Sequence, residues 1–398
     1  MLVSKTKHGD WFSLAVRYNQ EQLQELRKTE LFYCPECGEQ LILKIGSKKI
    51  SHFAHKQGAA CSNYYERESD YHLRGKILLY EWLSSMGFKP ILEPYYKEIS
   101  QRPDISFVYN NVQYALEYQC SIIPEELFIK RTNNYLKANI TPIWIMAGKN
   151  IKRKGNNKAS LSGFDYLFLS KASQKWRITA FCPVTNTLVN LHSIYPITIK
   201  NIITQFSITD LKAATIMHLL EPIGIQRFQL EDWQNEIRKG KNISPLYGTP
   251  QNKFLQELYR NALIPSYLPP EIGLPVFHAP FIETPAIQWQ SYLYIDVLNQ
   301  HREFTIEQVY HSFKKRVWSG EIKIRKLPLV REGNALIAVK EYLHLLVQVN
   351  FLQVVRGNRL QKVNTKQLAV NQIQQEKMER DFYHKYGKII IDSLNEAQ

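Results

Sequence analysis

Long hydrophobic runs are missing from this 398-residue sequence. No apolar stretch approaches the ~18 residues that a membrane-spanning helix needs, and the N-terminus has no hydrophobic signal core. Cysteine is also scarce, with five residues in the whole chain, and such an odd and sparse count excludes a disulfide framework. The sequence therefore predicts a cytoplasmic protein that is not inserted in a membrane.

Acidic residues are outnumbered, since 36 Asp and Glu stand against 51 Lys and Arg, which gives a net charge of +15. The hydrophobic fraction of 44% is sufficient for buried cores and excludes disorder of the whole chain. A basic excess indicates a polyanionic partner, either nucleic acid or an anionic membrane surface. The membrane is the weaker interpretation because a clear basic amphipathic helix is missing. Residues 1–150 contain 19 basic and 16 acidic residues, so +12 of the net charge lies downstream.

The order of helical and strand patterns predicts an α/β (α+β) chain, and a length near 400 residues favours two or three domains. We expect a small N-terminal module of strands at 1–63 and a mixed-sheet domain with β-β-α-β order at 64–150. A middle region at 151–264 either forms a domain or packs on the preceding one. A mainly helical region at 265–398 begins with six prolines between residues 265 and 285.

Apolar periodicity predicts helices over residues 19–30, 66–86, 124–138, 287–299, 306–318 and 335–350, with a polar helix after residue 371. Strands are expected at 91–94, 104–109, 114–119, 142–146, 166–169 and 178–182, and helices between there and residue 262. An Asn110-Asn111 turn joins the second and third strands. The last helices precede a hairpin at 351–363, which is typical of a winged-helix module, although an ordinary helical domain with a terminal hairpin fits equally well.

Five candidate zinc ligands lie close together in the N-terminal module: Cys34, Cys37, His52, His55 and Cys61. A two-residue spacer lets both thiolates of a knuckle reach one tetrahedral ion, and a hairpin would return the histidines beside it. The expected set is Cys34, Cys37, one histidine and Cys61, and the sequence does not choose between the histidines. A structural role is expected because the cluster contains no acid/base partner. The alternative is a reduced cluster without metal.

A set of carboxylates follows the zinc candidates. Glu68, His72 and Lys76 are spaced four residues apart, so they share one helix face. Hairpin pairing of the next strands would place Asp104 beside Glu117, and two such carboxylates repel each other unless a cation lies between them. Mg²⁺ or Mn²⁺ would resolve this repulsion and could polarise a phosphodiester. The alternative is a charged helix face with unrelated, solvated surface acids.

Six motifs in this order resemble the competence protein CoiA family. They are Tyr33-Cys-Pro-Glu-Cys-Gly38, His52-Phe-Ala-His55, Glu68-Ser-Asp-Tyr-His72, Arg102-Pro-Asp104, Leu116-Glu-Tyr-Gln-Cys-Ser121 and Pro142-Ile-Trp-Ile145. The resemblance covers about residues 1–150, while the rest matches in length, basic character and a Pro-rich segment at 263–270. It implies a zinc-ribbon-like N-terminus and a restriction-endonuclease-like nuclease domain of the PD-(D/E)XK superfamily. It also implies a role in natural transformation, in recombination of incoming DNA beside a RecA-type recombinase.

The same resemblance assigns roles to individual residues. Asp104 and Glu117 match the two acidic positions of the superfamily's strands, and Glu68 matches the helix acid found in many members. Gln119 stands where the usual pattern has a lysine, and glutamine can orient a water molecule but carries no positive charge. The candidates for supplying this charge are Lys76 of the first helix and Lys130 and Arg131 of the next.

Two functions remain open from the sequence. One is a metal-dependent deoxyribonuclease in which His72 and Lys76 assist phosphate contact or proton transfer. The other is a DNA-binding accessory factor that cleaves poorly or not at all, which the glutamine at position 119 favours. In both, DNA, including single-stranded or branched intermediates, is the expected partner. Oligomer formation stays open. The expected DNA contacts outside the nuclease domain are basic side chains, whose alternative interpretation is a solvated face: Lys314, Lys315, Arg316, Arg356 and Arg359.

Overall fold

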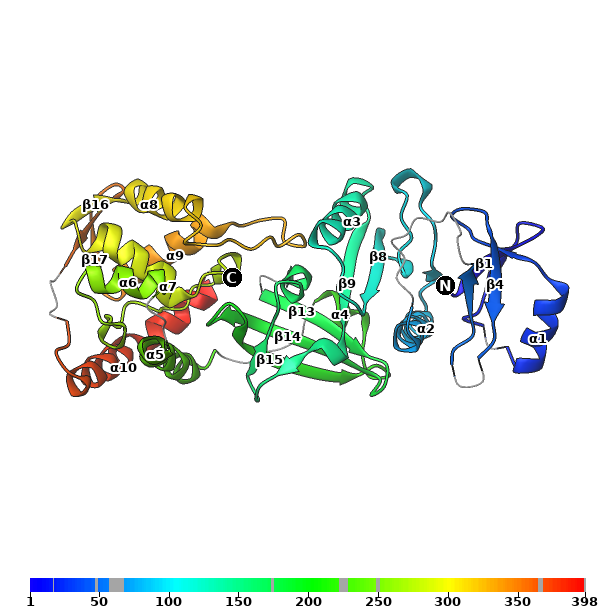
Figure 1. Ribbon diagram of the computed structural model, residues 1–398, viewed down its shortest axis with the longest axis horizontal. Coiled ribbons are helices and arrows are strands. Elements are labelled where there is room, and N and C mark those ends of the chain that lie inside the picture. The colour runs from blue at the N-terminus through cyan, green and yellow to red at the C-terminus, as the bar shows by residue number, and fades with distance from the viewer. Residues whose placement is uncertain are drawn as a thin grey trace. The chain divides into compact units, whose positions relative to one another are not determined.

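A computed structural model describes residues 1–16, 18–46, 49–56, 68–172, 175–221, 228–247, 251–363 and 368–396 of the chain (Figure 1). These residues form two compact units. The first unit comprises residues 1–151, 178–190 and 207–223, and the second comprises residues 152–177, 191–206 and 224–398. Helices and strands occur in both units, so the α+β class expected from the sequence is confirmed.

The N-terminal module of the first unit is a five-stranded antiparallel sheet with one helix. Its strand order is β2-β1-β3-β4-β5. Helix α1 (Gln20–Thr29) begins after Asn19, whose side chain caps it by accepting the Gln22 N–H at 2.8 Å. Buried Leu23, Phe32 and Phe53 form the module's core. The strands are β1 (Val3–Thr6), β2 (Trp11–Ser13), β3 (Phe32–Tyr33), β4 (Gln40–Lys44) and β5 (His52–His55).

A mixed sheet follows in the predicted β-β-α-β order. Asn110 and Asn111 have φ angles of 47° and 59°, the left-handed conformation that a two-residue hairpin turn requires. Helix α3 connects β8 to the parallel strand β9, and β13 also runs parallel to β9, so the order in this unit is β13-β9-β8-β7-β6. The elements are β6 (Ile91–Leu92), β7 (Ile105–Tyr109), β8 (Val112–Gln119), α3 (Glu125–Lys137), β9 (Thr141–Ala147) and β13 (Lys175–Cys182).

Helix α2 (Asp70–Ser85) packs closely on β8 (Figure 1). At Gly75 a Cβ atom would lie 2.0 Å from the ring of Tyr118, so only glycine permits this approach. The Tyr118 hydroxyl donates to the carbonyl of Phe181 in β13 at 3.0 Å, which connects β8 to the strand beyond β9. This packing brings the polar face of α2 to the beginning of β7 and the end of β8. The apolar face joins a core that includes Leu73, Leu79, Leu83, Ile105 and Leu116.

The expectation of helices after residue 182 is wrong for the next 28 positions. Two ten-residue strands, β14 (Thr187–Pro196) and β15 (Asn201–Asp210), occupy them, because their β-branched and aromatic residues pack well on a pleated surface. The predicted strand at 166–169 is instead a short 3₁₀ helix (Asp165–Phe168). Strands β13, β14 and β15 each contribute residues to both units, so the expected middle region 151–264 is divided between them. A short helix, α4 (Ile216–Leu220), follows in the first unit.

In the second unit the strand order is β10-β11-β15-β14-β13, and β12 pairs with β13. Residues 268–282 of the Pro-rich segment are buried throughout, so the expected boundary at 264 falls inside one compact unit. Here prolines accompany packed, irregular backbone rather than a linker. The elements are β10 (Lys152–Arg153), β11 (Lys158–Ser160), β12 (Ser170–Ala172), α5 (Leu230–Tyr247), α6 (Lys253–Arg260) and the 3₁₀ helices Pro265–Tyr267 and Ala279–Phe281.

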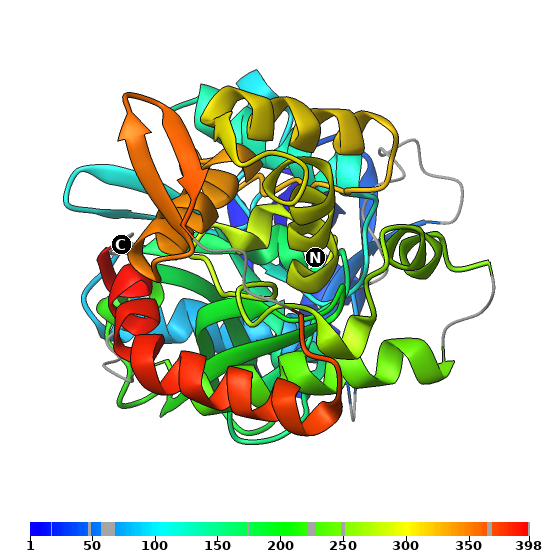
Figure 2. The same ribbon diagram turned by 90° about the vertical axis from the view of Figure 1, so that its left-hand side faces the viewer.

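The C-terminal part of the second unit has the helix–strand–helix–helix–hairpin order of a winged-helix module. Its three-stranded sheet has the order β16-β18-β17, so the second hairpin strand returns beside the strand that precedes the two helices. Figure 2 shows this hairpin in orange and the long helix α10 in red. The elements are α7 (Ala286–Leu293), β16 (Glu303–Thr305), α8 (Ile306–Trp318), α9 (Ala335–Gln348), β17 (Leu352–Arg356), β18 (Arg359–Lys362) and α10 (Gln372–Glu396).

In the described parts of the chain, no helix combines the length and the apolar character that a membrane crossing requires.

Candidate active site and zinc cluster

Glu68, His72 and Lys76 lie together, as their spacing predicts. Glu68 precedes α2, and Ser69 caps the helix by accepting the His72 N–H at 3.3 Å. The His72 Nδ1 atom lies 4.0 Å from Glu68 Oε1, and the ammonium of Lys76 contacts the same oxygen. The start of α2 therefore presents a carboxylate, an imidazole and an ammonium on one face.

Lys76 is the centre of a buried ion cluster. Its side chain is 1% exposed, and its ammonium contacts carboxylates of Glu68 and Glu93 and lies 3.4 Å from Asp104 Oδ1. Burial opposes its charge, but these three carboxylates outweigh burial and hold the pKa of Lys76 above its usual range. The lysine ammonium therefore holds three acids in place, and it is too deeply buried to reach a substrate.

Asp104 lies at the end of the loop that leads into β7. Its Oδ2 atom accepts the backbone N–H of Tyr118 at 2.8 Å and lies 3.3 Å from His72 Nε2. Burial would raise the pKa of Asp104, but Lys76 and His72 outweigh it and lower that pKa well below its usual value. Asp104 is thus ionised at neutral pH and directed toward α2.

Glu117 has different partners from Asp104. Its carboxylate accepts a hydrogen bond from the Tyr135 hydroxyl at 2.5 Å and another from the guanidinium of Arg131, both on α3. Burial raises the pKa of Glu117 to about 7, against the charge of Arg131 and with a further contribution from Asp104. Ile105 pairs with Leu116, so the two acids sit on neighbouring strands and influence each other electrostatically. Their carboxylates nevertheless point to separate partner sets.

Gln119 closes β8 two residues after Glu117. Its amide donates to the Ser121 carbonyl at 2.9 Å and lies 3.4 Å from the Ser121 hydroxyl. Among the cations proposed to replace the missing lysine, Lys76 is buried behind Glu68 and Asp104, Arg131 pairs with Glu117, and Lys130 is exposed. The guanidinium of Arg131, with 20% of its side chain exposed, is the cation beside β8.

The donor set at α2 fits a hard divalent cation. Ligand atoms of Glu68, His72 and Asp104 all lie within 4.8 Å of one another. In this cluster the carboxylates of Glu68, Glu93 and Asp104 face two ammonium groups, those of Lys76 and of Met1, whose nitrogen lies 2.5 Å from Glu68 Oε2. The excess negative charge and the oxygen-rich ligands suit Mg²⁺ or Mn²⁺.

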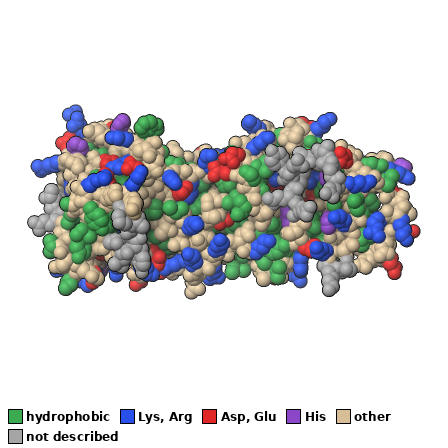
Figure 3. Space-filling view, viewed as in Figure 1, with side chains coloured by type: hydrophobic (Ala, Val, Ile, Leu, Met, Phe, Trp, Pro, Cys, Tyr) green, Lys and Arg blue, Asp and Glu red, His purple; other side chains and the backbone are tan. Residues whose placement is uncertain are grey.

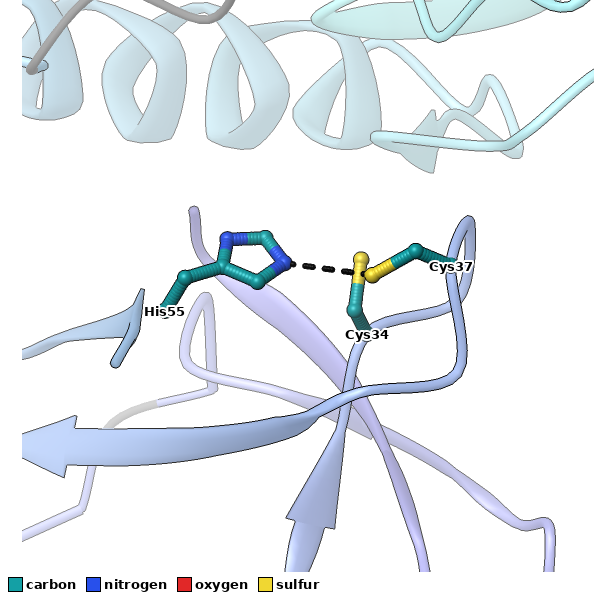
Figure 4. Close-up of side chains that lie close together, drawn as sticks. All are labelled: Cys34, Cys37 and His55. Atoms are coloured by element: carbon teal, nitrogen blue, oxygen red, sulfur yellow. Dashed lines mark hydrogen bonds between the residues drawn. The ribbon is translucent and has the colours of Figure 1, made fainter. Parts of the chain in front are cut away.

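The second ligand cluster lies in the N-terminal module (Figure 4). Cys34 and Cys37 flank the turn after β3, and His55 ends β5, with all three ligand atoms within 4.8 Å of one another. The Cys37 Sγ atom is 3.4 Å from His55 Nε2. Burial raises the pKa of Cys34 and lowers that of His55, so the imidazole is held neutral, as a metal ligand must be. Two sulfurs and one imidazole are three ligands of the kind that a tetrahedral zinc ion takes, so this cluster could hold zinc.

The remaining zinc candidates differ in position. His52 and His55 are three residues apart in one strand, so their side chains leave opposite faces of it. The His52 Nδ1 atom lies 3.0 Å from the Ile50 carbonyl instead of near the thiols. Geometry therefore separates the two histidines, which the sequence alone did not. Cys61, the expected fourth ligand, lies outside the described residues.

The candidate DNA contacts of the second unit are not equivalent. Lys314 and Lys315 are exposed on α8, and Arg356 is exposed at the hairpin. Arg359 is also exposed and lies 3.1 Å from a carboxylate oxygen of Glu303. Figure 3 shows basic side chains in blue dispersed among other residues on the drawn face, without a single continuous basic area in the described part. Arg316 is half-buried, because its guanidinium pairs with carboxylates of Asp296, Glu257 and Glu321.

Comparison with known proteins gives matches along most of the chain. Family models described as the CoiA N-terminal, nuclease-like and C-terminal domains match residues 15–64, 68–223 and 228–378. Competence protein CoiA from Bacillus subtilis (strain 168) is 30% identical over 338 residues, which are 84% of this chain and 90% of that protein. This chain belongs to the competence protein CoiA family. The comparison with solved structures gave no match. In this CoiA-family chain the nuclease-like match includes the whole carboxylate site and extends through β13, β14 and β15.

Sequence reasoning missed two residues of the site. Glu93 is 2% exposed and contacts Lys76, and Tyr135 is fully buried and donates to Glu117. A signal existed for Glu93, since an acid between apolar Leu92 and Pro94 in a short strand segment is unusual for a surface residue. Tyr135 is one helical turn beyond Arg131, so it shares that residue's face of α3.

Proposed function

We infer that this CoiA-family protein is a metal-dependent deoxyribonuclease that acts on DNA in natural competence. The observation that carries this inference is the convergence of Glu68, His72 and Asp104 around a buried lysine, next to Glu117 on the adjoining strand. Such a set of acids at the ends of neighbouring strands suits phosphodiester hydrolysis. The family's nuclease-like description supports the same chemistry.

The proposed roles of the residues follow from their positions in the site. Asp104, Glu68 and His72 would hold the cation, and Glu117 would join them from the adjoining strand. Bound Mg²⁺ or Mn²⁺ supplies Lewis-acid polarisation of the phosphodiester and lowers the pKa of water. Lys76 keeps Glu68 and Asp104 ionised and oriented from behind. The amide of Gln119 can orient the attacking water, and the Arg131 guanidinium provides the positive charge that glutamine lacks.

Other parts of the chain would bind rather than cut. A structural zinc held by Cys34, Cys37, His55 and Cys61 would stabilise the N-terminal module, which is too small for a large core of its own. The winged-helix part would hold DNA through phosphate contacts, consistent with +12 of the charge lying after residue 150. We expect single-stranded or branched DNA as substrate and cooperation with a RecA-type recombinase.

Cleavage of labelled single-stranded, duplex and branched DNA with Mn²⁺ or Mg²⁺ tests the nuclease. We expect cleavage that requires the metal and falls by at least ~10²-fold in Asp104→Asn and Glu117→Ala. Glu98→Gln, which changes an exposed acid of the same domain, should cleave normally. Absence of metal-dependent cleavage on every substrate, or normal cleavage by Glu117→Ala, would reject the proposal.

A second candidate is a DNA-binding accessory factor that does not cut. Gln119 favours it, since this position carries no ammonium and Lys76 shares its charge among three carboxylates. In that case the full chain binds DNA with metal present but leaves it intact, and Asp104→Asn weakens only the metal-dependent part of binding. The cleavage assay separates the two functions.

A further inference from the structure

The buried side chain of Glu93 contacts both the N-terminal module and the carboxylate site. Its Oε2 atom accepts the backbone N–H groups of Leu2 at 2.9 Å and Val3 at 3.2 Å. Its Oε1 atom contacts the ammonium of Lys76. Val3 is the first residue of β1, so one carboxylate connects that strand to the centre of the acid cluster.

The backbone of Glu93 is fixed as tightly as its side chain. Its φ angle is 47°, in the left-handed region that a residue other than glycine seldom adopts. Its N–H donates to the carbonyl of Asp104 at 2.9 Å, so it is bonded directly to the residue that supplies a candidate metal ligand. Such a conformation persists where the surrounding contacts impose it, and it is common at functional sites.

Strand β1 is in turn held by the zinc-binding part of the module. It lies between β2 and β3, and Lys5 pairs with Tyr33, the residue before Cys34. Just before β1, the Met1 carbonyl accepts the N–H of Phe53 in β5 at 2.9 Å, and Phe53 is two residues before His55. The strands that carry zinc ligands therefore set the position of the two N–H groups that Glu93 accepts.

We propose that Glu93 is a positioning residue that couples the folded zinc module to the nuclease site. This inference rests on the function proposed above and deepens it. With the module folded, β1 fixes the Glu93 carboxylate, which fixes Lys76, which holds Glu68 and Asp104. When the module loosens, Lys76 loses one of its three carboxylates and the acid cluster loses its geometry.

The coupling requires a carboxylate at position 93. A carboxylate accepts hydrogen bonds at both oxygens, so it can satisfy β1 and Lys76 together. The amide of glutamine has one oxygen and one NH₂ group. In either orientation an NH₂ group would therefore face the Leu2 and Val3 N–H groups or the Lys76 ammonium.

Glu93→Gln in the full chain tests the first half of the proposal. We expect kcat for DNA cleavage to fall about 10- to 100-fold, as for other residues that orient metal ligands, while KM changes little. Glu93→Asp, which keeps the charge, should recover part of the loss. The matched control is Glu379→Gln, because Glu379 is 6% exposed and pairs with buried Lys241 in the second unit, so it reports the general cost of neutralising a buried acid.

Hydrogen exchange of the β1 amides provides a readout independent of cleavage. Leu2 and Val3 should exchange faster in Glu93→Gln than in the unchanged protein or in Glu379→Gln. Unchanged exchange overturns the link between β1 and Glu93, whatever the catalytic result. If the wild-type protein cleaves no DNA, the proposed nuclease function fails. Hydrogen exchange then still tests whether Glu93 holds β1.

A double-substitution cycle tests the second half. Cys37→Ser should lower kcat and speed β1 exchange. Adding Glu93→Gln should cause a further loss smaller than the sum of the two single losses, since both changes disturb the Glu93 contact, while Cys37→Ser also disturbs the ion pair of Met1 with Glu68. Fully additive losses of kcat in the doubly substituted protein would overturn the coupling. A Glu93→Gln protein that cleaves DNA with the kcat of an active wild-type protein would overturn it as well.

Discussion

At the scale of single residues, Glu117 and Asp104 show how two acids on neighbouring strands acquire different proton affinities. Asp104 is surrounded by Lys76 and His72, and its pKa is lowered. Glu117 of β8 is buried beside the Arg131 guanidinium and the Tyr135 hydroxyl of α3, and burial raises its pKa to about 7. At neutral pH, Asp104 is therefore ionised, whereas Glu117 is divided between its protonated and its ionised form.

Cation affinity should follow the proton on Glu117. Because a cation requires the carboxylate form, Mn²⁺ affinity should fall by up to about tenfold per pH unit below pH ~7 and level off above it. Isothermal titration from about pH 6 to about pH 8.5 checks this expectation. The Glu117→Gln protein should bind Mn²⁺ weakly, and its affinity should not change with pH over this range. A wild-type affinity that stays constant across this range would contradict the assignment.

Substitution can distinguish the candidate zinc ligands from one another. We expect about one zinc per chain after native purification, loss of zinc in Cys37→Ser and His55→Gln, and retention in His52→Gln, because His52 points to the Ile50 carbonyl. Elemental analysis of each protein measures this. Retention of zinc by His55→Gln together with its loss in His52→Gln would reverse the assignment of the two histidines.

At the scale of elements, the hairpin of β7 and β8 was predictable because Asn110 and Asn111 readily adopt the left-handed turn between two apolar strands. The helix face with Glu68, His72 and Lys76 was predictable because a four-residue spacing is local. The partners of Glu93 were not predictable, since Leu2 is 91 positions away and only the folded chain brings the two together. Strands β14 and β15 were missed because the region's helix and strand signals compete, and pairing with distant strands decides between them.

His192 in strand β14 predicts how the stability of the second unit depends on pH. Burial, together with Arg177 and Lys175, lowers the pKa of His192 in this strand to about 4 from 6.5. The unfolded chain therefore binds more protons between these values, so stability is complete above pH ~6.5 and falls as the pH drops toward ~4, by a total on the order of 3 kcal/mol.

Urea unfolding at several pH values, followed through hydrogen exchange of β14 peptides, measures this loss. His192→Gln removes the titrating group and should flatten the dependence between pH ~4 and ~6.5. An equal loss of stability in both proteins would assign the effect to other groups.

At the scale of the whole molecule, +12 of the net charge of +15 lies after residue 150, and the proposed DNA contacts of that part belong to the winged-helix part. In α9 the exposed side chains are those of Lys340 and His344, whereas residues 353–359 of the hairpin are all exposed. We therefore expect the hairpin arginines to make more phosphate contacts than α9.

Salt dependence of DNA binding by the full chain tests this expectation. The double variant Arg356→Ala/Arg359→Ala should reduce the slope of log affinity against log salt by up to about 2, close to 0.9 per lost phosphate contact. Lys388→Ala, an exposed cation of α10, serves as the control and should leave the slope unchanged. An unchanged slope in the double variant would remove the hairpin from the DNA interface.

The sharing of β13, β14 and β15 between the two units has a consequence for dissecting the protein. The chain passes from one unit to the other five times, after residues 151, 177, 190, 206 and 223. A fragment ending near Gly148 keeps every described acid of the site but loses β13, so β9 becomes an unprotected edge strand of buried residues. Exposed edges of that kind pair with other molecules. Such a fragment should aggregate, so it cannot test the proposed nuclease function, and single substitutions in the intact chain are the informative tools.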